Sequence, residues 1–184
     1  MCPRVHLISS RSNGKVGSLI SRQWRRTSRL RLRRNRSSKN CSQPAKWIGL
    51  GESAALLQRA GWELWVVSAG SSWYVERVLR QAGVAASVYS NPGRLENGRG
   101  LVLDPTSPFH SASAGVDKSA VVRHALHIAE TVAFAGDGPP DLQPALLVRP
   151  NLRFARGFLA KALRARGEAF WPFSRWSEIA GKLA

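Results

Sequence analysis

Two aspartates four residues apart carry the strongest chemical signal in the sequence. They lie in the segment Gly136-Asp137-Gly138-Pro139-Pro140-Asp141, directly after the apolar run 131–135. Two carboxylates on a tight glycine turn at the tip of a strand suit Mg²⁺, a hard cation that prefers oxygen ligands. The pattern is equally typical of an Asp-Gly turn in which Asp141 caps a helix. Asp137 and Asp141 are therefore candidate metal ligands, with a purely structural turn as the alternative.

Ser68 is the second candidate, because it ends the apolar run 64–67. A hydroxyl at the C-terminal tip of a parallel strand lies in the crevice where such sheets bind ligands. The amides of Ala69 and Gly70, which we expect at the entrance of a helix, can also donate to a phosphate. Many strands end in a serine, so the alternative is a serine without a chemical role. The pattern predicts a phosphate-binding group at Ser68, Ala69 and Gly70.

Lys118 is the third candidate, and it stands just before a predicted helix over residues 119–129. A lysine at this place can neutralise both a phosphate and the carboxylate that attacks it. The alternative is a solvated surface charge, which is the usual state of a lysine at the start of a helix. A functional role of Lys118 is favoured only if the fold places it close to the other two candidate sites.

The elements that must position these residues alternate from about Trp47 onward. Apolar runs predict strands over residues 63–68, 131–135 and 145–148, and helices are expected over 52–60, 73–81, 119–129 and 154–167 and from about 176. Residues 84–103 predict a short strand and a hairpin. This alternation is typical of a parallel α/β sheet. Since such strands end at one edge, we expect Ser68, Lys118 and Asp137 in one crevice.

In this order, the three segments resemble the haloacid dehalogenase superfamily. There the second motif is a strand ending in Ser or Thr, the third is a Lys, and the fourth is a Gly-Asp-Gly-x-x-Asp type segment. Ser68, Lys118 and Asp137 with Asp141 occupy those positions. The spacing and the C-terminal segment are most similar to the branch that contains phosphoserine phosphatase and 2-hydroxy-3-keto-5-methylthiopentenyl-1-phosphate phosphatase. The resemblance covers about residues 47–184.

The resemblance implies a doubly wound parallel α/β sheet and an Mg²⁺-dependent phosphatase, a hydrolase of small phosphomonoesters. Ser68 would bind the phosphoryl group with Ala69 and Gly70, and Lys118 would hold phosphate and nucleophile together. Asp137 would ligate Mg²⁺, with Asp141 as a second ligand or as an orienting group. The expected partner is a small phosphorylated metabolite.

The sequence departs from the family at its first motif, Asp-x-Asp-x-Thr/Val on the first strand. The first Asp of that motif attacks phosphorus, and the second protonates the leaving group. The earliest aspartate of this chain is Asp104, which follows Ser68, so no residue matches the motif. The cap domain that this branch inserts between the first two motifs has no counterpart either. We therefore expect a truncated core whose first strand and cap are absent or replaced, and whose catalysis is impaired.

Residues 1–46 differ sharply in composition from residues 47–184. They hold 13 Lys or Arg and no acid, whereas the following 138 residues hold 15 basic and 11 acidic residues. Like charges at this density repel and leave too few apolar groups for a core, so we expect little packed structure there. A central strand over residues 5–10 would be the exception, and would mean that the first strand had been rebuilt without its acids.

Three accounts of the basic segment stay open, in this order. A frameshift or wrong start in GC-rich DNA would explain both the Arg- and Ser-rich composition and the missing motif. A transit peptide is also Arg-rich, Ser-rich and poor in acids. A nucleic-acid-binding arm is the third, and it supports the competing function: a non-catalytic protein that binds phosphate or nucleic acid.

Cysteines and apolar runs limit the remaining classes. Cys2 and Cys41 both lie in the basic segment, so a disulfide framework is excluded from residues 47–184. No apolar run approaches the roughly 20 residues of a membrane span, and no secretory signal is recognisable. A cytoplasmic protein without a membrane partner is the expectation.

Overall fold

The computed structural model describes residues 4–10, 49–93, 95–96, 99–100 and 103–184. Six strands form one sheet in the order β10-β9-β8-β1-β2-β3, and each neighbouring pair is parallel. The strands are β1 (Arg4–Ser10), β2 (Trp62–Ser71), β3 (Ser87–Asn91), β8 (Thr131–Gly136), β9 (Arg153–Ala155) and β10 (Trp171–Pro172). The predicted parallel α/β fold is confirmed.

β1 lies at the centre of this sheet. It pairs with β2 along its whole length, with Ser10 opposite Ser68, and with β8 from Arg4 to Ile8. The expectation of little packed structure in residues 1–46 is therefore wrong for Arg4–Ser10, and the division of the chain at residue 46 does not separate this strand from the core. The reason is that a central strand has its backbone polar groups paired on both sides, which local composition does not reveal. The first strand is thus replaced rather than absent.

Arg4–Ser10 is all that the structure describes of residues 1–46. The frameshift, the transit peptide and the nucleic-acid-binding arm are interpretations of a segment that otherwise lies outside the described residues. They stay predictions.

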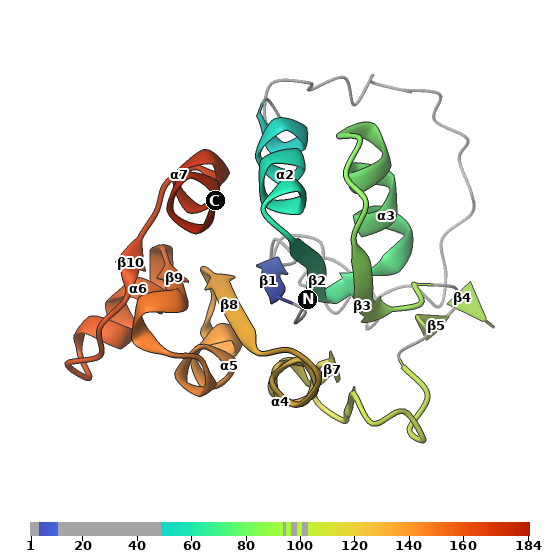
Figure 1. Ribbon diagram of the computed structural model, residues 1–184. Helices are drawn as coiled ribbons and strands as arrows, with labels where there is room; N and C mark the ends of the chain where they lie inside the picture. The colour runs from blue at the N-terminus through green and yellow to red at the C-terminus, as the bar shows by residue number, and fades with distance from the viewer. Residues whose placement is uncertain (1–3, 11–48, 94, 97–98, 101–102) are drawn as a thin grey trace, which may run out of the picture.

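Helices cover both faces of the sheet, which makes a three-layer architecture (Figure 1). On one face, α2 (Leu50–Arg59), α3 (Ser72–Gln81) and α7 (Trp176–Leu183) pack over a core that includes Leu57, Leu64, Val66, Phe154 and Ile179. On the other, α4 (Lys118–Ile128), α5 (Leu142–Leu147) and α6 (Gly157–Arg164) pack over a core that includes Val67, Val121, Phe134, Leu159 and Leu163. Such double coverage explains the continuous apolar runs of β2 and β8.

Two predicted elements after β8 are wrong. Residues 145–148 were expected as a strand, but they belong mostly to α5. The strand that follows β8 is β9, and two of its three residues, Phe154 and Ala155, fall in the helix predicted over 154–167; α6 begins only at Gly157. A run of four apolar residues fits a buried helix as well as a buried strand, so periodicity could not decide.

The segment between α3 and α4 carries two small antiparallel pairs. β4 (Leu95–Glu96) pairs with β5 (Arg99–Gly100), which confirms the expected hairpin, and β6 (His110–Ser111) pairs with β7 (Gly115–Val116). Short 3-10 helices, Pro139–Asp141 and Pro150–Leu152, follow β8 and α5. No helix in the described part of the chain is both long and apolar enough to cross a membrane.

Candidate active site

The candidate residues meet where the strand order of the sheet reverses. From β1 the chain adds β2 and β3 on one side, and then β8, β9 and β10 on the other. Doubly wound sheets bind ligands at the carboxyl ends of the strands at such a point. Ser10 ends β1 level with Ser68, and Asp137 directly follows β8, so all three lie at this edge.

Asp141 is the structural centre of the site. Its Oδ1 accepts a hydrogen bond from Lys118 Nζ at 2.8 Å, and its Oδ2 accepts from the amides of Asp137 at 2.9 Å and Gly138 at 2.8 Å. The side chains of Lys118 and Asp141 are 5% and 1% exposed, so this ion pair is buried. A Cβ at Gly136 would meet the Asp141 carboxylate at 2.8 Å, which is why the strand ends in glycine. Lys118 is thus no solvated surface charge.

Asn91 helps to bring Lys118 to this edge, and the sequence reading missed it. At the end of β3, its Nδ2 donates to the carbonyl of Ala69 at 2.8 Å and to that of Ala114 at 3.1 Å. Ala69 follows Ser68, and Ala114 precedes β7, which leads into α4. A side chain at Gly115 would collide with Asn91, and φ there is +76°. The tip of β2 and the segment that delivers Lys118 are therefore tied together.

Ser68 is 2% exposed and accepts a hydrogen bond on Oγ from the amide of Gly70 at 3.1 Å. Because the hydroxyl oxygen is the acceptor there, its own hydrogen stays available for a second partner. Ala69 and Gly70 were expected at a helix entrance, but they lie within β2, where the pairing with β3 shifts register between Ser68 and Ser71. The chain bulges at these two residues, a feature common beside active sites.

Asp137 has one partnered and one unpartnered oxygen. Its Oδ2 lies 3.4 Å from the guanidinium of Arg156, a residue that the sequence reading also missed. Its Oδ1 is buried and has no hydrogen-bond partner among the described residues. The main chain holds Asp137 in place, since its carbonyl accepts from the amides of Phe158 and Leu159 at 3.0 and 3.3 Å.

These carboxylates do not by themselves make an Mg²⁺ site. Three of their four oxygens already accept from Lys118, from two amides or from Arg156. Among the described residues, only the buried Oδ1 of Asp137 has no hydrogen-bond partner. Within the described residues, no cluster of three or more His, Cys, Asp or Glu could hold a metal. Mg²⁺ in proteins keeps near-octahedral oxygen coordination, usually with a carboxylate or two of its own. Both oxygens of Asp141 are engaged in these contacts, which favours the predicted orienting role over that of a second ligand; both roles stay predictions.

The two other aspartates have structural partners. Asp117 caps α4, because its Oδ1 accepts from the amides of Ser119 and Ala120 at 2.8 and 3.0 Å. Asp104 lies in a loop, where hydrogen bonds from the backbone and hydroxyl of Thr106 lower the pKa of its carboxyl. Neither carboxylate follows a strand of the main sheet, so neither takes the place of the missing first motif.

Replacing the cap of α4 tests this assignment of Asp117. Asp117→Ala should lower the free energy of unfolding by about 1 kcal/mol, because two amides of the first turn lose their acceptor. Asp104→Ala, in an exposed loop, should change it much less. Urea denaturation followed by circular dichroism measures both. Equal stability of the two variants would contradict the capping role.

The comparison with protein families settles where the chain belongs. Residues 14–146, most of the chain, match the haloacid dehalogenase-like hydrolases. This chain belongs to that family. The match contains Ser68, Lys118 and both aspartates of the site, and it begins after β1. No protein of curated function matches the sequence significantly.

Several solved structures have the same fold as this chain. The cobalt-bound deoxy-D-mannose-octulosonate 8-phosphate phosphatase from Haemophilus influenzae matches with a TM-score of 0.53 at 12% identity, over 98% of this chain and 86% of that one. A protein from Vibrio cholerae assigned as a 3-deoxy-D-manno-octulosonate 8-phosphate phosphatase matches with a TM-score of 0.53 at 16% identity, over 98% and 83%. A hypothetical protein from Xanthomonas campestris matches with a TM-score of 0.51 at 18% identity, over 98% and 80%. At these identities the likeness concerns the fold alone.

Proposed function

We propose that this member of the haloacid dehalogenase-like hydrolases binds the phosphoryl group of a small phosphomonoester at the β1–β2–β8 edge and hydrolyses it very slowly or not at all. The observation that carries the proposal is the buried pair of Lys118 and Asp141 at the edge where Ser68 lies near the end of β2. A lysine that donates to a carboxylate at this edge can also attract the anionic phosphoryl group.

Each group at the edge has a part in this binding. The hydroxyl of Ser68 would donate to one phosphoryl oxygen, because its acceptor side is taken by Gly70. The ammonium of Lys118, which donates to Asp141, would place a positive charge beside the bound anion. The bulge at Ala69 and Gly70 interrupts the pairing with β3, which supports a further role of the Ala69 amide in binding. The Gly70 amide donates to Ser68 Oγ and would orient that hydroxyl.

The substrate class is inferred from the family and its structural neighbours. Two neighbours are named for sugar-acid 8-phosphates, which are small phosphorylated metabolites. A partner of that size suits a single basic side chain and a few hydroxyl or amide donors. Which metabolite binds depends on contacts beyond the phosphoryl group, and a cytoplasmic location fits such a partner.

The family's Mg²⁺-dependent hydrolysis needs groups that this chain lacks. No aspartate precedes Asp104 in the sequence, so the nucleophile and general acid of the first motif have no counterpart. The strand that should carry them is present as β1, and it ends in Ser9 and Ser10. Catalytic impairment follows from this replacement, while phosphate binding depends on other residues.

Titration with inorganic phosphate tests the binding. Isothermal titration calorimetry on the full chain should give saturable binding, and Ser68→Ala should weaken it by roughly tenfold, because a hydrogen bond to a charged group is lost. Ser87→Ala, the same change at the start of β3 on the opposite edge, should leave the affinity unchanged. Absence of binding, or equal affinity in both variants, would refute the proposal.

A further inference from the structure

Among the described residues, the carboxylates of Asp137 and Asp141 each pair with one cationic side chain. Asp137 and Asp141 contribute two negative charges, and Lys118 and Arg156 contribute two positive ones within 2.8 and 3.4 Å of carboxylate oxygens. A divalent cation at Asp137 would therefore add a third cationic group, after Lys118 and Arg156, to a site with two carboxylates. Its approach would be opposed mainly by Arg156, which contacts the same side chain.

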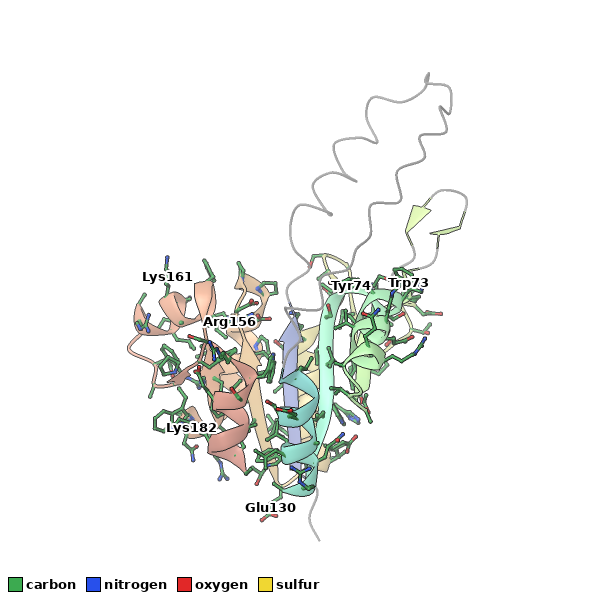
Figure 2. The ribbon with its side chains drawn as sticks, turned by 90° about the horizontal axis from the view of Figure 1, so that it is seen from above. Trp73, Tyr74, Glu130, Arg156, Lys161 and Lys182 are labelled. Atoms are coloured by element: carbon green, nitrogen blue, oxygen red, sulfur yellow. The ribbon has the colours of Figure 1, made fainter. Side chains whose placement is uncertain are left out.

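Both the backbone amide and the guanidinium of Arg156 have contacts that hold it beside Asp137. Its amide donates to the carbonyl of Gly136 at 3.1 Å, which places it next to the end of β8. Its guanidinium donates to the carbonyl of Ser174 at 3.4 Å and lies over the Phe173 ring at 5.4 Å. Glu130 directly precedes β8 and so marks the end of the sheet where this strand begins. In Figure 2, Arg156 lies well above Glu130, toward the end of the sheet where β8 finishes.

The pair of Arg156 with Asp137 is weak enough to be replaced. The two side chains are 49% and 24% exposed, and the contact between them is long, at 3.4 Å. Exposed ion pairs of this kind contribute little to stability. The second oxygen of Asp137 is buried and has no hydrogen-bond partner among the described residues, so both oxygens of this carboxylate can bind a cation that displaces Arg156.

We infer that Arg156 is a built-in counter-ion of Asp137, which takes the place of a divalent cation and competes with one for this carboxylate. The inference deepens the proposed function: the phosphoryl group is bound at Ser68 and Lys118 without a metal ion. A cation reaches Asp137 only when the guanidinium moves out toward solvent. Arg156 is thus a positioning residue that sets the metal affinity of the site.

Binding of Mn²⁺ and Mg²⁺ in the absence of phosphate tests the inference. Free Mn²⁺ measured by electron paramagnetic resonance should show only millimolar affinity for the native chain, and Arg156→Gln should tighten it by about tenfold, because a like charge beside the ion is removed. Arg156→Lys keeps the charge and should stay near the native affinity. The gain should vanish when Asp137→Asn is added to Arg156→Gln.

Arg166→Gln is the matched control, because Arg166 lies just beyond the other end of α6 and the one contact described for its guanidinium is with the carbonyl of Ala162. An equal gain in Arg166→Gln would overturn the inference, since it would reflect net charge alone. The inference would also be overturned if folded Arg156→Gln bound Mn²⁺ with unchanged affinity, or if the native chain bound Mn²⁺ with submillimolar affinity.

Two readouts keep the inference separate from the proposed function and from folding defects. Phosphate titration of the native chain in EDTA should match that in Mg²⁺; if phosphate binds only with Mg²⁺, the inference fails while the phosphate site stands. In the native chain, the side-chain ¹⁵N–¹H signal of Arg156 should shift as Mg²⁺ is added, which needs no variant. A signal that stays in place while Mg²⁺ binds would also overturn it.

Discussion

We expect the chain to release phosphate from small phosphomonoesters at no more than a trace rate. Removing the nucleophile from a concerted catalytic site costs on the order of a million-fold in rate, which corresponds to about 8 kcal/mol of activation free energy. Here the general acid of the first motif is missing from the sequence as well, and Asp104 and Asp117 have other partners. The two carboxylates left at the edge are occupied by Lys118, by amides and by Arg156.

A colorimetric phosphate-release assay measures this directly. The full chain is incubated with Mg²⁺ and several small phosphomonoesters, beside Asp137→Ala as the matched variant. Both should stay at the background of the buffer. Turnover of about 1 s⁻¹ or more, abolished in Asp137→Ala, would show that another residue supplies the nucleophile. A rate that is equal in both proteins would instead indicate a contaminating phosphatase.

The second large effect concerns the buried ion pair of Lys118 and Asp141. We expect Lys118→Met to lower the free energy of unfolding by about 3–5 kcal/mol, because it leaves Asp141 buried without its cationic partner. Asp141→Ala should cost a similar amount, since Lys118 and the amides of Asp137 and Gly138 lose the acceptor described for them. Single domains are often stable by only about 5–15 kcal/mol, so either loss brings the chain close to unfolding.

Arg123→Met is the matched control on the same helix. Arg123 pairs with Asp117 at 3.6 Å, but the two side chains are 58% and 38% exposed, so its loss should cost less than about 1 kcal/mol. Urea denaturation measures the free energy of unfolding of each variant. If the m-value does not change, a shift of the urea midpoint reports a change in stability. If Lys118→Met is no less stable than Arg123→Met, the lysine does not hold the site together.

The local chemistry of the site was readable from the sequence because it depends on strand ends. Ser68 and Asp137 each follow an apolar run, and parallel strands end at one edge of their sheet. The cap at Asp117 was equally local, since a carboxylate reaches amides only two and three residues on. Residue type and spacing were therefore enough to predict the parallel fold and to group the candidate residues.

Contacts between distant segments were decided only by the tertiary structure. β1 is stabilised by pairing with β2 and β8, so the acid-free residues around it concealed a central strand. The apolar run at 145–148 fits helix or strand, and only its place beside α4 and β8 makes it part of α5.

The partners of the site residues were likewise decided by the tertiary structure and not by the local sequence. Lys118 reaches Asp141 across 23 residues, and Arg156 reaches Asp137 across 19, although neither distance in sequence follows any local period. The sequence by itself determined which residue types stand at the strand ends. The packing of the sheet decided that each carboxylate there would have a basic side chain as its partner, because only packing brings such separate segments within bonding distance.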